Sequence, residues 1–439
     1  MFYMKVTVIG TGYVGLVAGT CFANFGIEVN CIDNDVTKIN ALKEGVIPIY
    51  EPGLEELVIK NNKNGHLHFS TDKSLLDKAD ILVIAVGTPA AKDGNANMTY
   101  LDSVLEDIAK YVSHNKYIII KSTVPVGTAN RVKKTLEEKR RDLKFSIISN
   151  PEFLREGSAV NDFFYPDRIV IGTMDEESKE IARKLYAPVI TNDTHIEFTD
   201  NSTAEIIKYA ANAFLAMKVA FINEISDIAE QFGGNIEDIA NGIGSDKRIG
   251  KHFLKPGPGY GGSCFPKDTL ALAKTANDAS IPSLIINAVI DSNDRRKRKM
   301  ASKVISALNG DINGKTIAIL GLTFKAETDD MRDSASIDII NVLKNKGAII
   351  KAYDPKGMEE AKKIFGDRIE YCNDLFTAAN NAEALCIITE WAEFKTLDLH
   401  RLQKCMQQPI IIDLRNIYSR EEMSSSGFTY ISLGRAKVN

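Results

Sequence analysis

Short apolar runs alternate with amphipathic stretches through the first half of the chain. Apolar runs of four to six residues predict β-strands, and these are Lys5–Ile9, Glu28–Ile32, Ile81–Val86, Tyr117–Lys121, Phe145–Ile148 and Arg168–Ile171. Apolar residues at helical spacing predict helices between them, and these are Tyr13–Phe25, Val36–Lys43 and Ser103–Val112. Strands that alternate with helices of this length pair in parallel, because each crossover helix returns the chain to the same end of the sheet. The pattern therefore predicts an α/β fold with a doubly wound sheet.

The pattern becomes helical near residue 200. Ser202 and Glu205 have the spacing of a capping box, and apolar positions then recur at helical spacing as far as Gly233. This predicts a long helix of about 30 residues. A second long helix is expected to follow Pro282 and to run toward Leu308.

Strand–helix alternation resumes at Lys315. The predicted strands are Thr316–Leu320, Ile349–Tyr353, Ala384–Ile388 and Ile410–Leu414, and Asp338–Lys346 is a predicted helix. Together the three patterns predict two Rossmann-like doubly wound domains joined by a central helical domain. We place the N-terminal domain at residues 1–200, the helical domain at 201–308 and the C-terminal domain at 309–439.

Composition and charge narrow the class of protein. The chain has 439 residues, of which 44% are hydrophobic and 26% charged, as in an ordinary globular protein. A net charge of −4 argues against a nucleic-acid or membrane-surface binder, and we interpret the basic run Arg295–Lys299 as a solvated helix face. Six scattered cysteines with no C-x-x-C pair argue against a zinc ribbon and favour a reducing, cytoplasmic location. We expect no metal site.

The uncharged segment Val6–Ile27 has the length of a signal peptide or a membrane span, but glycines interrupt it. Three of them form Gly10-Thr-Gly12-Tyr-Val-Gly15 between a predicted strand and a predicted helix. There they allow a tight turn, a close approach to pyrophosphate and close helix packing. Asp33 ends the second predicted strand, 18 residues after Gly15, where a carboxylate binds ribose hydroxyls and repels a 2′-phosphate. The motif predicts an NAD site, with glycine-rich packing as the alternative.

Two further loops, Val86–Pro89 and Ser122–Gly127, follow predicted strands. Ligands bind beyond the carboxyl ends of parallel strands, so both loops are candidate ligand contacts. Their Pro and Gly residues are equally typical of ordinary turns.

Cys264 differs from the other five cysteines in its surroundings. It directly follows the glycine-rich stretch Pro256–Ser263, which suggests a loop that closely approaches a ligand. Lys267 and the N-terminus of the following helix would favour its thiolate. The others fit predicted helices, strands or loops, where cysteine packs as a small hydrophobe: Cys21, Cys31, Cys372, Cys386 and Cys405. Cys264 is therefore a candidate nucleophile, and a structural turn is the alternative.

A nucleophilic cysteine beside a nicotinamide cofactor suggests a definite chemistry. Hydride transfer from a thiohemiacetal gives a thioester, which water hydrolyses to a carboxylic acid. Glu152 and Asp268 are available as the base or the water-positioning group. Lys208 and Asn212 lie four residues apart on the predicted long helix and would stabilise a developing oxyanion. A solvent-facing polar pair fits the same spacing.

Several motifs, in one order, resemble the UDP-glucose 6-dehydrogenase family of nucleotide-sugar dehydrogenases over essentially the whole chain. They are Gly10–Gly15 with Asp33, Tyr50–Gly53, Ser122–Gly127, Asn150–Gly157, Lys208–Asn212, Gly259–Asp268, Gly321–Lys325 with Arg332, and Thr389–Trp391. The resemblance implies oxidation of a sugar C6 alcohol to a carboxylate by four electrons, which two NAD accept. It also implies UDP-glucose as the small-molecule partner and a homodimer paired through the helical region, with no nucleic acid or membrane as partner.

The resemblance further implies residue roles. Cys264 would be the nucleophile, Lys208 and Asn212 would stabilise the oxyanion, and three residues would manage protons and water: Asp268, Thr123 and Glu152. Which of these is the base in each step stays open. The cofactor positions are Gly10, Thr11, Gly12, Tyr13, Val14, Gly15, Asp33, Lys38, Thr88, Thr123, Glu156, Lys267 and Arg332. The substrate positions are Glu152, Phe153, Leu154, Arg155, Lys208, Asn212, Arg248, Phe253, Leu254, Lys255, Pro256, Gly257, Tyr260, Gly261, Phe324, Lys325 and Arg415.

Two residues beside Cys264 bear on the choice of sugar. Ser263 precedes it, where UDP-N-acetylmannosamine dehydrogenases tend to carry His, and Phe265 follows it, where GDP-mannose dehydrogenases usually carry Leu. Both residues favour UDP-glucose, with the other two sugars as alternatives for the same chemistry. A non-catalytic sensor of NAD or a nucleotide sugar is a further alternative, but it gives no reason for Cys264.

Overall fold

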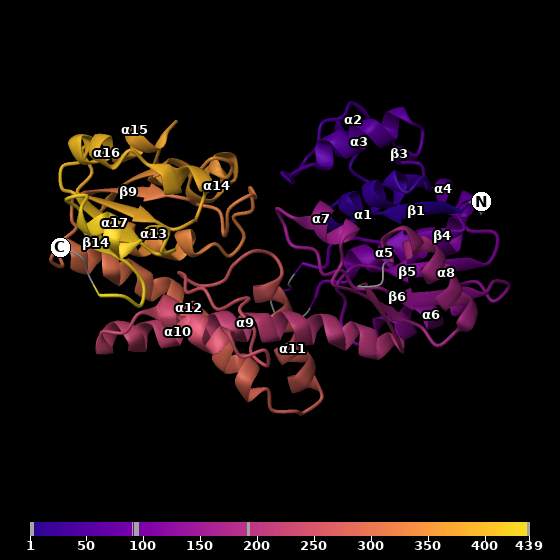
Figure 1. The fold of residues 1–439 in the computed structure, drawn as a ribbon. Helices are drawn as coiled ribbons and strands as arrows, with labels where there is room; N and C mark the ends of the chain where they lie inside the picture. Colours follow the sequence, from indigo (N-terminus) through magenta and orange to yellow (C-terminus); the bar gives the residue numbers. More distant parts are fainter. Residues whose placement is uncertain (1–3, 90, 92–95, 191–193, 437–439) are drawn as a thin grey trace. The chain divides into compact units, whose positions relative to one another are not determined.

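A computed structural model of the protein describes residues 4–89, 91, 96–190 and 194–436. It divides into two compact units, Met1–Ala211 and Asn212–Asn439 (Figure 1). Among the described residues, none of the helices has both the length and the apolar character needed to span a bilayer. The uncharged segment at the N-terminus instead supplies strand β1 (Lys5–Ile9) and helix α1 (Tyr13–Asn24), which lie in the core of the first unit.

The first unit contains an eight-stranded sheet in the order β3-β2-β1-β4-β5-β6-β7-β8. Neighbouring strands pair in parallel, except β6 with β7, which pair antiparallel. Besides β1, the strands are β2 (Glu28–Ile32), β3 (Leu67–Ser70), β4 (Ile81–Ile84), β5 (Lys116–Ile120), β6 (Phe145–Ser149), β7 (Arg168–Gly172) and β8 (His195–Thr199). The six predicted strands are confirmed, whereas β3 and β8 were not predicted.

Helices cover both faces of this sheet. Ile81 and Val83 of β4 pack in one core cluster with α1, whereas Leu82 and Ile84 pack in a second cluster with α5 and α6. This arrangement confirms the doubly wound α/β prediction. Besides α1, the helices are α2 (Val36–Lys43), α3 (Leu54–Lys63), α4 (Leu75–Lys78), α5 (Thr99–Tyr111), α6 (Thr128–Lys139), α7 (Ala159–Phe164) and α8 (Glu176–Tyr186).

The second unit contains a six-stranded parallel sheet in the order β11-β10-β9-β12-β13-β14. Its strands are β9 (Thr316–Leu320), β10 (Ile349–Tyr353), β11 (Glu370–Tyr371), β12 (Ala384–Ile387), β13 (Ile410–Asp413) and β14 (Thr429–Ile431). Its sheet-covering helices are α13 (Ala335–Asn345), α14 (Met358–Phe365), α15 (Leu375–Ala379), α16 (Leu399–Cys405) and α17 (Arg420–Ser424). Four strands and α13 were predicted, and β11 and β14 were not.

Four helices lie between the two sheets in the sequence. They are α9 (Asn201–Phe232), α10 (Ile236–Gly244), α11 (Phe265–Asp278) and α12 (Leu284–Ala307). The predicted long helices are confirmed as α9, with 32 residues, and α12, with 24. The predicted capping box is wrong, because Asp200 accepts the N–H of Thr203 at 2.9 Å and Glu205 bonds elsewhere.

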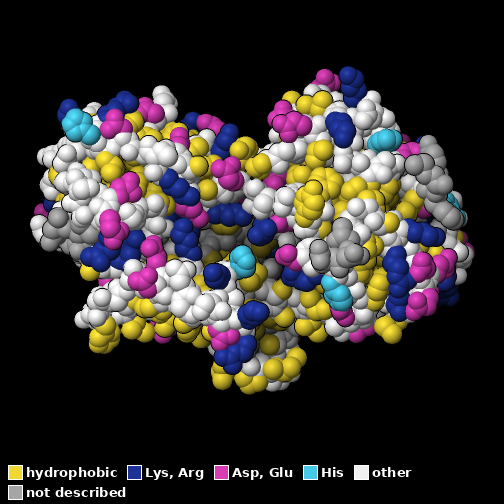
Figure 2. All heavy atoms as spheres, viewed as in Figure 1, with side chains coloured by type: hydrophobic (Ala, Val, Ile, Leu, Met, Phe, Trp, Pro, Cys, Tyr) yellow, Lys and Arg dark blue, Asp and Glu magenta, His cyan; other side chains and the backbone are white. Residues whose placement is uncertain are grey.

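The basic run Arg295–Lys299 on α12 is not wholly a solvated face. Arg296 and Lys297 are only 5% and 4% exposed, whereas Arg295, Arg298 and Lys299 are exposed. Figure 2 shows that basic and acidic side chains are interspersed on the face in view, in keeping with the small net charge.

Candidate active site

The loop between β1 and α1 carries Gly10 and Gly12, and Gly15, the third predicted phosphate-loop glycine, lies in the first turn of α1. Gly10 has a backbone φ of +97°, and a Cβ there would lie 2.8 Å from the carbonyl oxygen of Ala85. A Cβ on Gly15 would lie 2.0 Å from the carbonyl oxygen of Gly10, so both positions require glycine. Gly12 is the N-cap of α1 and has no side chain to accept the N–H groups of the first turn. These N–H groups are therefore suited to bind a pyrophosphate.

Asp33 follows β2 and is held by this loop. Its Oδ2 accepts the Thr11 N–H at 2.9 Å and the Thr11 hydroxyl at 2.8 Å, and it lies 3.3 Å from Lys38 Nζ. Burial acts to raise the pKa of Asp33, but the hydrogen bonds from Thr11 and Asp35 and the charge of Lys38 outweigh it and lower the pKa. The predicted ribose-binding carboxylate therefore lies beside the glycine loop in its charged form.

The two predicted strand-end loops contact each other. The Thr88 hydroxyl donates to the carbonyl of Thr123 at 2.7 Å, and the Ser122 hydroxyl donates to the carbonyl of Val86 at 2.7 Å. The structure thus brings Thr88 and Thr123 together, as parallel strands that end at one edge of a sheet require.

Lys208 and Glu152 form a buried ion pair. Lys208 Nζ lies 3.0 Å from Glu152 Oε1, and the two side chains are 4% and 5% exposed. The other oxygen of Glu152 accepts the Leu154 N–H at 2.6 Å, and Lys208 Nζ lies 5.4 Å from the ring centre of Phe153. Because Lys208 and Asn212 are both buried, they are not a solvent-facing polar pair.

Glu205 was not predicted to belong to the site. It precedes Lys208 on α9, and its carboxylate accepts the N–H groups of Gly127 at 2.6 Å and Ala129 at 2.9 Å. Burial raises the pKa of Glu205 in spite of these hydrogen bonds. Glu205, Thr123 and Lys208 line one small cavity, so this carboxylate holds the loop that carries Thr123.

In the second unit, Cys264 stands at the N-cap of α11. One turn later, the buried Asp268 accepts a hydrogen bond from Asn212 Nδ2 at 2.6 Å and lies 2.6 Å from Lys267 Nζ. The N–H of Asp268 donates to the carbonyl of Cys264 at 2.8 Å. Four predicted residues of this unit are therefore assembled around one helix end.

The remaining cysteines lie in less reactive surroundings. Burial raises the pKa of Cys31 to about 12 and that of Cys372 to about 11, and it raises the pKa values of Cys21 and Cys386 further. Burial also raises the pKa of the partly exposed Cys405. Their thiolates are therefore disfavoured.

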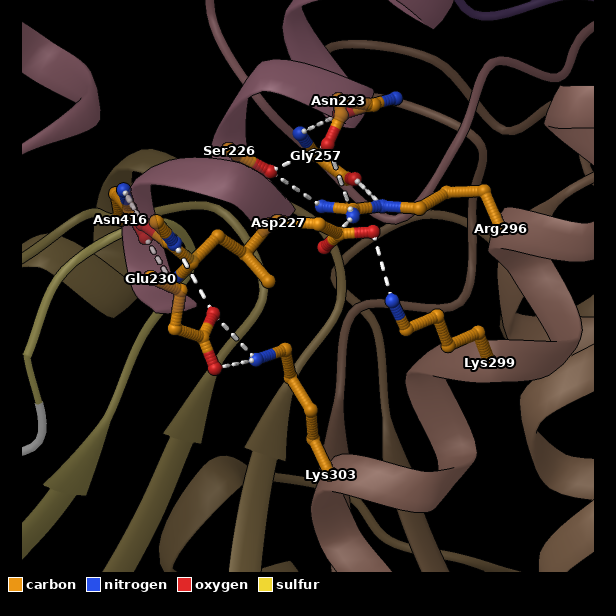
Figure 3. A network of polar contacts seen from close by, with 11 residues as sticks. Asn223, Ser226, Asp227, Glu230, Gly257, Arg296, Lys299, Lys303 and Asn416 are labelled. Carbon is orange, nitrogen blue, oxygen red and sulfur yellow. Dashed lines mark hydrogen bonds and ion pairs between the residues drawn. The ribbon is translucent and has the colours of Figure 1, made fainter. Parts of the chain in front are cut away.

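Side chains of α9 and α12 hold the glycine-rich loop before Cys264. The Gly257 N–H donates to Asn223 Oδ1 at 2.8 Å, and its carbonyl accepts from Arg296 Nε at 3.0 Å (Figure 3). Arg296 is anchored in turn by Asp227, whose Oδ1 lies 2.5 Å from its Nη1. The buried Asn293 accepts the Tyr260 N–H at 2.8 Å and donates to the Tyr260 carbonyl at 3.0 Å. Sequence reasoning missed Asn223, Asn293 and Arg296, because a polar residue on a helix gives no signal of which loop it meets.

Other predicted substrate positions adjoin this loop. Arg415 donates to the carbonyl of Phe324 at 2.8 Å, and a Cβ on Gly257 would lie 3.1 Å from Arg415 Nη1. A Cβ on Gly261 would lie 3.2 Å from that of Phe324, and Lys325 Nζ lies 5.5 Å from the Phe324 ring centre.

Arg415 forms an ion pair with Glu390, and the other three predicted arginines are ion-paired as well. Arg155 pairs with Asp162 in the first unit, and in the second unit Arg332 pairs with Asp330 and the largely exposed Arg248 with Asp246. No group of three His, Cys, Asp or Glu side chains suited to a metal is present within the ranges that the structure describes.

Three domain models of one protein family match this chain in order. Residues 4–190 match the NAD binding domain of the UDP-glucose/GDP-mannose dehydrogenase family, residues 202–295 its central domain and residues 318–420 its UDP binding domain. The chain belongs to this family. An NAD-binding domain is therefore present, and the resemblance seen in the motifs is confirmed.

Relatives match over all or nearly all of their length. The chain is 50% identical to the UDP-glucose 6-dehydrogenase of Rhizobium meliloti (strain 1021), covering 98% of this chain and 100% of the relative. It is 45% identical to UDP-glucose 6-dehydrogenase TuaD of Bacillus subtilis (strain 168), covering 99% of this chain and 94% of the relative. The solved structure of a UDP-glucose dehydrogenase from Pyrobaculum islandicum matches with a TM-score of 0.90 and 34% identity, covering 98% of this chain and 96% of that one.

Proposed function

We propose that this family member is an NAD-dependent UDP-glucose 6-dehydrogenase, which oxidises UDP-glucose to UDP-glucuronate. The observation that carries the proposal is Cys264 at the N-cap of α11, beside the Asn212–Asp268 hydrogen bond. Full-length similarity to UDP-glucose 6-dehydrogenases supports the choice of sugar, as do Ser263 and Phe265 on either side of the cysteine.

The residues of the first unit fit NAD. The glycine loop has no room for side chains at Gly10 and Gly15, and Asp33 is a charged acceptor for ribose hydroxyls. Bound NAD supplies the hydride acceptor in each of the two oxidations. Gly10–Gly15, Asp33, Lys38, Thr88, Thr123 and Glu156 would hold it, together with Lys267 and Arg332.

The proposed chemistry uses Cys264 to hold the sugar between the two oxidations. As the first hydride leaves C6, the alcohol proton passes to a carboxylate, Asp268 or Glu152, and an aldehyde forms. The Cys264 thiolate adds to this carbon, and loss of a second hydride converts the thiohemiacetal into a thioester. Water then adds, and the Cys264 thiolate leaves as the carboxylate forms. In total, one alcohol, one water and two NAD give one carboxylate, two NADH and three protons.

The oxygen on C6 carries negative charge at several of these stages. Lys208 would supply a positive charge, which its buried pairing with Glu152 holds in one position. Asn212 would donate from its amide, which the bond to Asp268 orients. Phe324, Lys325, Arg415 and the 253–261 loop would bind the UDP-sugar, since Arg and Lys form charge-assisted hydrogen bonds with a diphosphate.

Counting NADH tests this proposal. We expect two NADH for each UDP-glucose consumed, and a Cys264→Ser variant that does not complete the oxidation. One NADH for each sugar, or full turnover by this variant, would contradict the proposal. Higher kcat/KM for GDP-mannose or UDP-N-acetylmannosamine than for UDP-glucose would keep the chemistry and change the substrate.

We further propose a cytoplasmic homodimer that keeps the three domains at 1–200, 201–308 and 309–439. Phe214, Phe221 and Ile228 are exposed at seven-residue spacing along α9, and Phe232 follows them. Exposed Leu284 and Ile285 add apolar surface at the start of α12, where Figure 2 shows hydrophobic side chains over the turn after α11. Apolar surface of this extent favours burial against a second copy.

A further inference from the structure

The motif Tyr50–Gly53 has no role in the chemistry above, although it is among the motifs that carry the family resemblance. Its acidic residue, Glu51, lies just before α3 in the first unit and is only 6% exposed. A buried carboxylate is retained where several donors satisfy it, so the partners of Glu51 indicate what it does.

The first partners of Glu51 lie at the start of α7. Glu51 Oε1 accepts the Ala159 N–H at 2.7 Å, and Glu51 Oε2 accepts the Gly157 N–H at 2.7 Å. Gly157 ends the segment Glu152–Gly157, which contains proposed sugar-binding and cofactor-binding residues. Glu51 therefore fixes the C-terminal end of that segment.

Helix α7 is also tied to the middle of the same segment. The carboxylate of Asp162 accepts the Arg155 N–H at 2.9 Å and pairs with the Arg155 guanidinium. A turn closes between them, because the Ser158 N–H donates to the Arg155 carbonyl at 2.9 Å. A displacement of Gly157 would therefore move the residues that precede it.

A further partner of Glu51 is Tyr13, which belongs to the Gly10–Gly15 motif and begins α1. The Tyr13 hydroxyl donates to Glu51 Oε2, and it also accepts the Gly157 N–H at 3.2 Å. Burial raises the pKa of Tyr13, and Glu51 raises it further, so the phenol keeps its proton and acts as a donor. One carboxylate thus joins the cofactor loop to the segment 152–157.

We propose that Glu51 is a positioning residue that couples NAD(H) binding to UDP-sugar binding through Tyr13 and Gly157. A dinucleotide that contacts the Gly10–Gly15 motif would restrain Tyr13, and Glu51 would pass this restraint to the 152–157 segment. By linkage, the UDP-sugar then tightens dinucleotide binding by the same factor. The inference rests on the proposed function, because it assigns the two loops to those two ligands.

Calorimetric titration of UDP-glucose with and without saturating NADH tests the coupling, since this pair does not turn over. We expect NADH to tighten UDP-glucose binding to the wild-type protein by at least about fivefold, the lower end of ordinary allosteric coupling. Tyr13→Phe keeps the ring and removes the hydroxyl, and we expect the factor to fall below about twofold. Glu51→Gln should have the same effect if it folds, and Tyr13→Phe decides the matter if it does not.

Two exposed residues nearby serve as controls. Tyr165→Phe, after α7, and Glu55→Gln, on α3, should keep the wild-type coupling factor. Wild-type coupling in Tyr13→Phe, or UDP-glucose binding that NADH does not tighten in the wild type, would overturn the inference alone. A wild-type protein that does not bind UDP-glucose at all would overturn the proposed function as well. A merely structural role would lower the melting temperature of Tyr13→Phe and leave the coupling factor intact.

Discussion

The Lys208–Glu152 pair shows how a buried charge is kept in the first unit. Each side chain is at most 5% exposed, and Glu152 also accepts a backbone N–H. Removing one member of a buried pair is far more costly than removing a surface partner, because the other charge stays in a medium that solvates it poorly. Loss of one member alone is therefore expected to destabilise the fold as well as to impair the proposed chemistry.

We expect Glu152→Gln to lower the free energy of unfolding by about 3 kcal/mol or more, because it takes the negative charge away from a buried ammonium. NADH formation should fall at the same time. Urea titration and a steady-state assay measure the two effects. Adding Lys208→Met should restore much of the stability and none of the activity.

Asp102→Asn is the control for this experiment, since Asp102 and its partner Arg131 are both largely exposed. Exposed pairs contribute at most about 1 kcal/mol. A Glu152→Gln protein as stable as the Asp102→Asn protein would contradict the expectation.

The lowered pKa of Asp33 has a measurable consequence for stability. A carboxyl whose pKa is lower in the folded than in the unfolded state stabilises the fold above the unfolded value and loses this contribution as the pH falls through the folded value. We expect Asp33→Asn to flatten the acid side of the stability curve, from about pH 5 downward.

Asp33→Asn should also raise kcat/KM for NADP relative to NAD at least about tenfold, because the charge that repels a 2′-phosphate is gone. An unchanged cofactor ratio would argue against Asp33 at the ribose.

At the scale of elements, the central strands are predictable and the edge strands are not. The four strands that were not predicted are β3, β8, β11 and β14, and each lies at an edge of its sheet. Interior strands such as β4 are buried on both faces and are apolar throughout, whereas β8 is partly exposed along its whole length. An edge strand therefore lacks the continuous apolar run that predicts a strand from sequence.

The candidate site divides in a similar way. Gly10–Gly15, Asp33 and Cys264 stand in motifs whose local spacing has a direct chemical meaning. Asn293 and Arg296 act by meeting a loop about 35 residues away in the sequence, and this contact depends on how α12 packs. Arg296 also stands in the basic run Arg295–Lys299, and the charge of this run favoured the interpretation that its side chains face solvent. Local pattern shows what a loop can bind, and tertiary packing decides what holds the loop.

We expect Asn293→Leu to lower kcat at least about tenfold, because displacement of a site by about 1 Å is costly to catalysis and the Tyr260 peptide loses both side-chain partners. Asn293→Asp should also be impaired at neutral pH, where its carboxylate repels the Tyr260 carbonyl. Its activity relative to wild type should rise as the pH is lowered, because a protonated carboxyl can again accept from the N–H and donate to the carbonyl. Asp294→Asn, at the exposed neighbouring position, should match wild type at every pH.

At the scale of the whole molecule, the exposed apolar residues Phe214, Phe221 and Ile228 form a stripe along α9 that predicts the oligomeric state. Phe221 lies at its centre and is 51% exposed in the single chain. We expect the wild-type protein to sediment with twice the chain mass of 48.4 kDa and Phe221→Glu to sediment as a monomer. Tyr100→Glu, an equally exposed aromatic on α5, should leave the dimer intact. A wild-type protein with the mass of one chain would contradict the prediction.

Helix α9 has one more consequence for the chemistry. Lys208 and Asn212 are four residues apart within one uninterrupted helix, so they are separated by about 6 Å along its axis and by about 40° around it. Backbone hydrogen bonds alone maintain this spacing, and it needs no loop to close. Insertion of one residue between them would turn Asn212 away from Lys208 by a further 100° or so, while leaving every side chain of the site present. The two proposed oxyanion donors are thus sensitive to the length of the chain between them as well as to their own identity.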